Sequence, residues 1–450
     1  MLLEDVTEKK QLPAFDVFKL SIQYLVNHLL DLLEKQGNLV KHNEVRWVLT
    51  VPAIWTDRAK KFMRSCAEAA GIPKDNLFLA LEPETASIFC QYLSTEKLKG
   101  SEPGFTMTSE GTEYMVVDLG GGTADITVHK KVANGRLKEL HRAIGNDCGG
   151  TAIDKRFFEL FEEIVGKTVL NSLKRECPLA YFDLVREFES KKRTVETKRV
   201  FMEIPLVALD KMCQKVLQNN FEILLENSPH LQEIKLVASK IRMSVDFFKT
   251  FFMPSIKGVI SLMREIFRNK SLKNVAHVLM VGGFSECQLL QNAVRNAFPD
   301  QRIIIPDEAG LSVLKGAVLF GHKPDYIQSR VMRCSYGVKT NLPWKENIFS
   351  LIVGKDESVE AGMIVKKSFC TSYRHQDKMD VMVYVSEDTT QGYVDDDRYL
   401  LLCKPTIMFS DTCEELRWVD VEFVLGNTEI DLKAHDKMSG EEISAKFNLI

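Results

Sequence analysis

Residues 116–128 constrain the possible folds of this chain more than any other stretch. Two runs of apolar and β-branched residues flank three consecutive glycines and a threonine, a pattern typical of a strand, a tight turn and a second strand. Because glycine has no Cβ, this turn can adopt positive φ angles and leave its backbone N–H groups bare, an arrangement that binds phosphate. Gly120, Gly121, Gly122 and Thr123 are therefore predicted to bind the phosphates of a nucleotide.

An acidic residue stands at each end of this turn. Asp118 and Asp125 are suited to a hydrated Mg²⁺ ion, since Mg²⁺ prefers one or two carboxylates together with water. A purely structural hairpin is the alternative, but such a hairpin requires neither the threonine hydroxyl nor the two acids. The pattern is not Gly-x-Gly-x-x-Gly or Gly-x-x-x-x-Gly-Lys opening a helix, which argues against Rossmann and Walker nucleotide sites.

The turn and several later segments resemble one known family. Residues 118–125 are similar to the second phosphate loop of the heat-shock-protein-70 chaperones, within the actin and sugar-kinase ATPase superfamily. The resemblance runs from about residue 15 to the C-terminus, and the residues that make up its motifs are most similar to those of the divergent family-12 branch. It is also carried by residues 51–55, 82–83, 148–154, 189–193, 281–283 and 306–309.

This resemblance implies an α/β fold of the actin-like (ribonuclease H-like) two-lobed ATPase type, followed by a C-terminal β-sandwich-like domain. Residues 1–112 would be the remainder of lobe I, and residues 113–328 lobe II with a helical subdomain at about 156–275. Residues 329–450 would be the β-domain. The family's first phosphate hairpin and catalytic lysine are absent from this sequence, so we expect an N-terminally truncated first lobe with a sheet edge to be covered or paired.

The resemblance also implies roles for residues outside the turn. The family's matching glutamate helps to place the attacking water and the metal, so Glu82, Asp118 and Asp125 are the candidate catalytic residues. A glutamate that only caps the following helix is the alternative for Glu82. The candidate nucleotide-binding residues beyond the turn come from the later motifs: Gly149, Gly150, Glu189, Lys192, Arg193, Gly282, Gly283 and Asp307.

The motif at residues 189–193 has two interpretations. Glu189, Lys192 and Arg193 are spaced i, i+3 and i+4, so they share one face of a helix and can converge on the ribose and base of one ligand. A run of cations more commonly forms a solvated helix face, which is the alternative. Glu286 stands where the family commonly has an arginine near the adenine, and an acid cannot make the same cation–π contact.

Periodicity and composition complete the expectations. Apolar spacing predicts helices at 14–34 and 57–70, a strand at 77–81, a loop at 97–112 and mostly helix over 168–275. A net charge of -3 gives no electrostatic case for binding nucleic acid, and no stretch of about 18 apolar residues predicts a membrane span. Ten cysteines without paired spacing fit reduced thiols in a cytoplasmic protein better than disulfides or zinc.

Three functions remain open. The first is an ATP- or ADP-binding, Mg²⁺-dependent chaperone-like protein whose hydrolysis is weak or absent, because one of the family's two phosphate hairpins is missing. The second is an active ATPase chaperone. The third is a non-enzymatic scaffold that uses the β-domain, where the family's position implies a protein or peptide client. No Gly-x-Ser-x-Gly elbow or zinc motif supports hydrolase or zinc chemistry.

Overall fold

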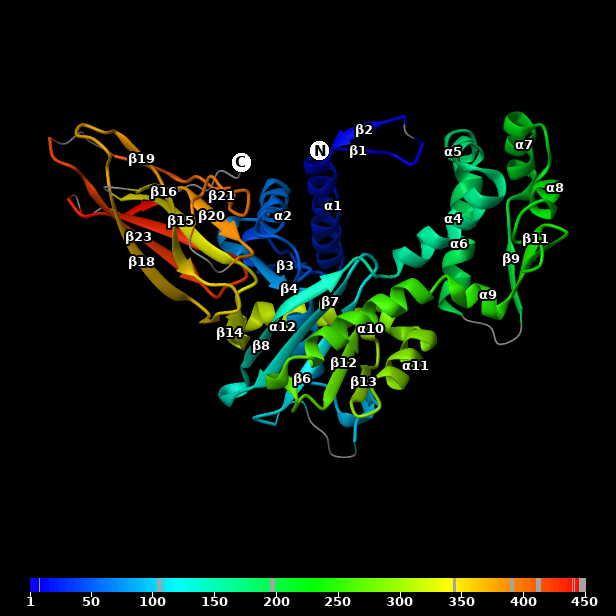
Figure 1. Ribbon diagram of the computed structural model, residues 1–450, viewed down its shortest axis with the longest axis horizontal. Helices are drawn as coiled ribbons and strands as arrows, with labels where there is room; N and C mark the ends of the chain where they lie inside the picture. The colour runs from blue at the N-terminus through cyan, green and yellow to red at the C-terminus, as the bar shows by residue number, and fades with distance from the viewer. Residues whose placement is uncertain are drawn as a thin grey trace.

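The computed structural model describes residues 1–7, 9–102, 107, 109–194, 199–342, 345–388, 392–409, 414–438, 440 and 442–444. In Figure 1 a β-rich region lies at the left, a large sheet with its helices in the centre, and a mostly helical region at the right. The α/β class expected from the sequence is therefore confirmed.

The centre of the molecule is an eight-stranded mixed sheet. The predicted strand, turn and strand at 116–128 are confirmed, because β6 and β7 form an antiparallel hairpin while β6 also pairs in parallel with β12. Its inner strands are almost completely buried, as near-continuous apolar runs require. In spatial order the strands are β17 (Ser358–Glu360), β14 (Ile327–Val331), β8 (Leu137–Asn146), β7 (Ala124–Lys131), β6 (Glu113–Leu119), β12 (His277–Val281), β13 (Arg302–Pro306) and β5 (Leu98–Lys99).

Helices cover both faces of this sheet, and side chains alternate between them along β6. Met115 and Val117 join a core with the helices of one face, whereas Tyr114 and Val116 join a core with those of the other. The first face carries α4 (Thr151–Val165), α10 (Met253–Phe267) and α11 (Gln288–Ala297), and the second carries α3 (Glu82–Cys90) and α12 (Ser312–His322).

Two of these helices touch because of one glycine. A Cβ on Gly316 of α12 would lie 1.7 Å from the carbonyl oxygen of Thr85 in α3, so any larger residue would force the helices apart. This close contact fixes α3, and with it Glu82 at its first position, against the sheet.

A smaller unit lies beside the large sheet. The predicted helices and the predicted strand are confirmed here as α1 (Ala14–Lys35), α2 (Asp57–Ala69) and β4 (Leu77–Leu81), and the strand β3 (Trp47–Val51) lies between the two helices in the chain. Strands β3 and β4 form a separate parallel pair, and the chain begins with a short hairpin of β1 (Leu2–Glu4) and β2 (Gln11–Pro13). Thr56 caps α2, since its side chain accepts a hydrogen bond from the Ala59 N–H.

Two predictions made from local pattern were incomplete, since each segment also contains strands; residues 103–106 and 108 of the first lie outside the described residues. The expected loop at 97–112 contains β5, which pairs with β13 at the edge of the large sheet. The expected mostly helical segment 168–275 also contains a three-stranded antiparallel sheet. Its elements are α5 (Lys167–Glu176), α6 (Pro178–Arg193), β9 (Arg199–Glu203), α7 (Leu206–Leu217), α8 (Phe221–Glu226), β10 (Ile234–Val237), β11 (Lys240–Ser244) and α9 (Val245–Thr250).

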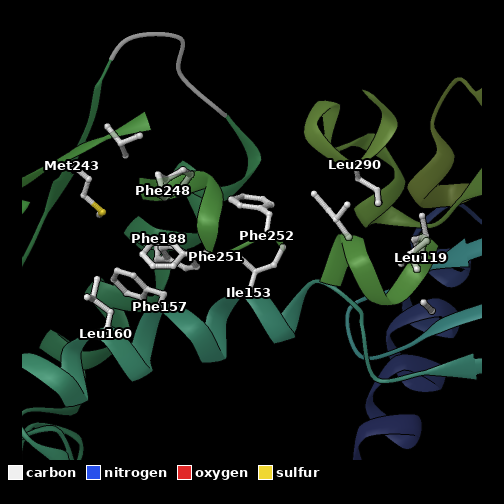
Figure 2. Close-up of a cluster of buried hydrophobic side chains, with 14 of the residues drawn as sticks. Leu119, Ile153, Phe157, Leu160, Phe188, Met243, Phe248, Phe251, Phe252 and Leu290 are labelled. Carbon is white, nitrogen blue, oxygen red and sulfur yellow. The ribbon is translucent and has the colours of Figure 1, made fainter. Parts of the chain in front are cut away.

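Aromatic packing holds this helical region together. Figure 2 shows Phe157 of α4 and Phe188 of α6 facing each other among Phe248, Phe251 and Phe252. The rings of Phe157 and Phe188 stack with centroids 4.0 Å apart and an interplanar angle of 7°. Because both rings are buried, they fix α6, which bears Glu189, Lys192 and Arg193, relative to α4, which follows directly after Gly149 and Gly150.

From Ser335 onward the described residues contain strands and no helices. Strand β23 alternates buried and exposed side chains, with Val419, Val421 and Phe423 in a core shared by its two main sheets. One sheet contains β16 (Lys345–Val353), β15 (Ser335–Leu342), β20 (Val383–Ser386) and β21 (Leu400–Cys403); the second contains β18 (Met363–Cys370), β23 (Trp418–Leu425), β24 (Asp431–Asp436) and β25 (Glu442–Ser444). β19 (Lys378–Asp380) and β22 (Thr406–Met408) form a separate pair.

No helix in the described part of the chain has both the length and the apolar character that crossing a bilayer requires. The nine cysteines in the described ranges are all free thiols.

Candidate functional site

The glycine turn is held from behind through its carbonyl groups. Three consecutive N–H groups donate to these carbonyl oxygens. The Gly149 N–H donates to the Gly122 oxygen at 3.3 Å, the Gly150 N–H to the Gly120 oxygen at 3.1 Å, and the Thr151 N–H to the Gly121 oxygen at 2.8 Å. The Thr151 hydroxyl also donates to the Gly121 oxygen at 2.9 Å. The start of α4 therefore fixes the conformation of the turn.

Gly149 is required for this contact. A Cβ at that position would lie 2.5 Å from the Gly121 oxygen and 2.6 Å from the Gly122 carbonyl carbon. Gly150 has more room, with the nearest atoms about 4 Å away. The motif at 148–150 thus acts first as the backbone support of the glycine turn.

The amide side of the turn is open. Gly121 and Gly122 are exposed, nothing lies within 4 Å of a Cβ built on either, and the N–H groups of Gly121, Gly122 and Thr123 find no acceptor within the described ranges. The expectation of positive φ angles was wrong, since none of the three glycines adopts one. The glycines instead leave space in front of three unpaired amides, which suits an anion.

Asp118 and Asp125 flank the turn at directly paired positions of β6 and β7. Both are almost completely buried, with 4 % and 1 % of their surface exposed. Burial, followed by the charges of Glu82 and Asp125, raises the pKa of Asp118 well above its usual value. Burial also raises the pKa of Asp125, although hydrogen bonds from Thr123 and the Ile54 N–H act in the opposite direction.

Glu82 lies close enough to interact with both aspartates. Burial and the negative charge of Asp125 raise its pKa to about 7. The alternative, in which Glu82 only caps α3, is not supported. The N-cap of α3 is Leu81, Glu82 is the first residue of the helix, and no side chain makes a cap hydrogen bond there. Two buried carboxyl groups and the half-buried Glu82 thus come together beside the turn and repel one another, an arrangement that a cation stabilises.

Direct chelation of a metal is not what these groups provide. Across the described ranges, no set of three or more histidine, cysteine, aspartate or glutamate side chains is arranged to hold one ion. A hydrated Mg²⁺ ion fits better, because it keeps several waters and needs only one or two carboxylates.

Lys192 brings the motif of α6 to the glycine turn. Its Nζ donates to Asp154 Oδ1 at 2.7 Å and to the Gly150 oxygen at 3.4 Å, and pairs with Glu189 at 2.6 Å. Arg193 pairs with Glu189 at 2.8 Å, and its side chain is 76 % exposed. The expected shared face is therefore present, with Lys192 directed to the support of the turn and Arg193 directed to solvent.

The loop after β12 completes the surroundings of the carboxylates. Gly282 has a φ of 84°, and a Cβ there would lie 2.7 Å from Asp118 Oδ1. Gly283 has open space at the Cβ position. A short 3₁₀ turn at Gly283–Glu286 follows, and α11 begins at Gln288.

Two acidic residues near this loop, the candidate Asp307 and the departure Glu286, have partners outside the carboxylate cluster. Asp307 pairs with Lys99 of β5 at 2.9 Å, so its carboxylate does not point to the three site acids. Glu286 accepts a hydrogen bond from the Gly310 N–H at 3.3 Å. The turn that follows β13 nevertheless touches the Gly282 loop, since the Gly282 N–H donates to the Ala309 oxygen at 3.0 Å.

Sequence reasoning missed one residue close to the site. Arg333, between β14 and β15, donates to the carbonyl oxygens of Ala53 and Trp55 at 3.1 and 3.3 Å. Its charge acts on Asp125, and the intervening Ile54 N–H donates to Asp125 Oδ1 at 2.9 Å. No local pattern identifies Arg333, because it is distant in sequence from every motif.

Comparisons with known proteins identify relatives of this chain. A family model described as a domain of unknown function (DUF8340) matches residues 107–305, which include the glycine turn and the helical region. Human heat shock 70 kDa protein 12A is 32% identical over 457 residues, covering 86% of this chain and 67% of the relative.

Two further relatives match over most of the chain. Human heat shock 70 kDa protein 12B is 29% identical over 522 residues, covering 98% of this chain and 76% of the relative. The chaperone protein DnaK of Mycoplasmoides gallisepticum is 21% identical over 371 residues, covering 81% and 55% respectively. On this identity and coverage, the chain belongs to the heat shock 70 kDa protein family, in its 12A/12B branch.

Proposed function

We propose that this protein binds ATP or ADP with Mg²⁺ in an actin-like, two-lobed fold and acts as a chaperone-like member of its family. The single observation that carries the proposal is the glycine turn. Its carbonyl groups are held by Gly149, Gly150 and Thr151, while the amides of Gly121, Gly122 and Thr123 face open space. A turn that presents its amides to open space while its carbonyl groups are held from behind stabilises an anionic phosphate chain.

The three carboxyl groups supply the metal side of the site. Asp118 and Asp125 would hold the waters of a hydrated Mg²⁺ ion, and Glu82 would orient a water near the phosphates. The bound cation neutralises phosphate charge. Because it also lowers the pKa of neighbouring acids, it relieves the repulsion that raises the pKa values of Glu82 and Asp118.

The sugar and base side comes from two other elements. Lys192 lies next to Gly150 and therefore within reach of the phosphate or ribose, with Glu189 and Arg193 on the same helix face. Gly282 and Gly283 form the facing loop beside Asp118. The Asp307 carboxylate pairs with Lys99. Asp307 therefore contributes to the nucleotide site only through the backbone of the turn that contains it. We expect the site to select weakly among bases, because Glu286 stands where the family commonly has an arginine near the adenine.

Hydrolysis by this chain is slow in our proposal. The part of the chain that the structure describes supplies one glycine hairpin to the phosphates, whereas efficient phosphoryl transfer requires charge stabilisation from several sides. In this view the protein uses the bound nucleotide for conformational stability and for interaction between regions 1–112, 113–328 and 329–450, which we propose as its domains.

Melting experiments test the proposal directly. Purified protein is heated with Mg²⁺ and ATP or ADP, and binding is measured independently by calorimetry. A ligand at about 100 times its Kd stabilises the folded state by about 2.7 kcal/mol. Asp118→Asn and Gly122→Asp should reduce the shift, whereas Glu159→Gln on the exposed face of α4 should preserve it. No shift with either nucleotide would contradict the proposal.

A turnover assay separates binding from hydrolysis. ATP hydrolysis that is fast, and that is abolished by Glu82→Ala with nucleotide affinity unchanged, would favour the active ATPase. Slow turnover with intact binding supports the proposal.

A client-binding role for the β-domain is a second candidate. Several apolar side chains of its strands are exposed, among them Ile364 (51 %), Leu400 (65 %), Met408 (57 %) and Trp418 (49 %). Exposed apolar side chains on sheets favour contact with extended peptides. Binding of a labelled apolar peptide to the full chain, weakened by Trp418→Asp and not by Val207→Asp on α7, would support it. Equal loss with both variants would contradict it.

A further inference from the structure

The small antiparallel sheet of the helical region has one face in the core and one face at the surface. Its strands lie in the order β10, β11, β9. Alternate residues of these strands, Val200, Met202, Ile241 and Met243 among them, are buried in the core of the helical region. The residues between them point to the opposite side and are exposed or half-buried. In Figure 1, β9 and β11 lie at the right-hand end of the helical region, beyond α6.

Five charged side chains lie on this outer face, and four of them are cations. Arg199 and Glu203 come from β9, Lys235 from β10, and Lys240 and Arg242 from β11. Lys240 pairs with Glu203 at 3.0 Å. Arg199, Lys235 and Arg242 form no ion pair with any residue that the structure describes. The outer face therefore has three uncompensated positive charges.

Two of these cations face each other across adjacent strands. Lys235 of β10 and Arg242 of β11 are direct partners in the strand register, so both side chains stand side by side on the outer face. Like charges at directly opposed positions destabilise a sheet, whereas opposite charges, such as Lys240 and Glu203 on β11 and β9, stabilise it. The pair of Lys235 and Arg242 is therefore a cost to folding that an anion bound between them would remove.

Apolar side chains stand among the cations. Phe201 of β9 is the register partner of Arg242 and is 40 % exposed, and Val237 of β10 is the partner of Lys240 and is 48 % exposed. Folding alone does not require an aromatic ring at this exposed position. Interfaces between proteins are enriched in aromatic side chains and arginine, so this combination indicates a contact surface rather than a merely solvated face.

We propose that the outer face of β9, β10 and β11 binds an acidic segment of a partner protein. Carboxylates of the segment pair with Arg199, Lys235 and Arg242, and an apolar side chain packs on Phe201. Charge complementarity favours this occupant, because three cations on the face lack a partner within the described residues. Single-stranded nucleic acid fits less well, since its bases stack on several aromatic side chains and the three strands contain one, Phe201.

Fluorescence anisotropy on the full chain tests the proposal. The probe is a labelled peptide of glutamates with phenylalanine at its centre, and its neutral counterpart has glutamine in place of glutamate. We expect the acidic peptide to bind and the neutral one to bind at least about tenfold more weakly. Lys235→Glu/Arg242→Glu should weaken binding of the acidic peptide by a similar factor. The matched control Lys270→Glu/Lys273→Glu makes the same change of charge at exposed positions before β12 and should leave the affinity unchanged.

A single substitution separates binding from folding. Lys235→Glu places opposite charges at a directly paired position, so it should raise the melting temperature of the protein while it weakens binding of the acidic peptide. A solvated face without a ligand predicts the first effect alone. The proposal is overturned if the acidic peptide does not bind, if the glutamine peptide binds equally well, or if the control variant loses as much affinity. Tighter binding of a single-stranded oligonucleotide or of phosphatidylserine vesicles at the same face would also overturn it.

Discussion

Arg330 and Glu84 form a buried bidentate ion pair between β14 and α3. The guanidinium Nε and Nη2 each donate to one carboxylate oxygen at 2.7 Å, and the two side chains are 11 % and 2 % exposed. Arg330 Nη1 also donates to the Gly426 oxygen at 2.5 Å, in the turn between β23 and β24. One side chain therefore connects the helix that begins at Glu82 with the C-terminal β-region.

Removal of this arginine should be strongly destabilising. Arg330→Met leaves the Glu84 carboxylate buried without a partner, and such a loss costs about 3–5 kcal/mol. Urea unfolding measures the change. Arg186→Met is the matched control, because its pair with Asp183 is 73 % and 66 % exposed, and an exposed pair contributes about 0–1 kcal/mol. Equal effects of the two substitutions would contradict the role of the buried pair.

The ionisation of Glu82 should make the stability of the nucleotide-free protein depend on pH. Its pKa is about 7 in the folded state, against an ordinary value of 4.5. The folded state therefore holds this proton more tightly than the unfolded state. The free energy of unfolding should fall as pH rises from about 4.5 to 7, by up to roughly 3 kcal/mol. Glu82→Gln should flatten this part of a pH-dependent unfolding curve, and Glu159→Gln should not.

The same ionisation predicts the pH dependence of Mg²⁺ binding. The cation favours the deprotonated carboxyl groups, so its affinity should increase as pH rises through about 7. Calorimetric titration with Mg²⁺ in the presence of ADP measures this slope. An affinity that is constant between about pH 6 and 8 would contradict the assignment of Glu82 to the metal side.

Substitutions at Gly149 and Gly121 should distinguish support of the glycine turn from contact with phosphate. Gly149→Ala places a methyl group 2.5 Å from the Gly121 oxygen, and such overpacking costs about 1–3 kcal/mol of stability. Gly121→Ala enters open space, so stability should change by only about 0.5 kcal/mol. Nucleotide affinity should nevertheless fall in Gly121→Ala, because the methyl group occupies space in front of the amides. Unchanged affinity would contradict phosphate binding at this turn.

Lys192 should matter for affinity more than for folding. Lys192→Gln removes its contacts with Asp154 and Gly150, and we expect about tenfold weaker binding of ADP by calorimetry. The control Arg156→Gln changes a cation of α4 that pairs with Glu159 at the exposed surface. Equal affinity of both variants would leave Lys192 without a role in the site.

The sequence alone determined the elements whose pattern is local. The apolar spacing of α1 and α2, the alternation along β23 and the strand–glycine–strand motif at 116–128 each depend on residues within one segment. The family resemblance could be recognised for the same reason, because its motifs are short and follow a fixed order.

Local pattern failed wherever a distant segment determined the outcome. Strand β5 has two residues and exists only because β13 is beside it, and β9–β11 form a sheet that helical periodicity obscures. The glycine turn was expected to use positive φ angles, yet Gly149–Thr151 holds it in another conformation. A short stretch of sequence does not show which remote residues will form hydrogen bonds with its backbone.

Only the tertiary structure decided how the site residues are grouped. It brings Glu82 to Asp118 and Asp125, turns Asp307 towards Lys99, and adds Arg333 from a segment without any motif. The physical reason is that burial, charge repulsion and strand pairing depend on distances in space, which residue order along the chain does not specify.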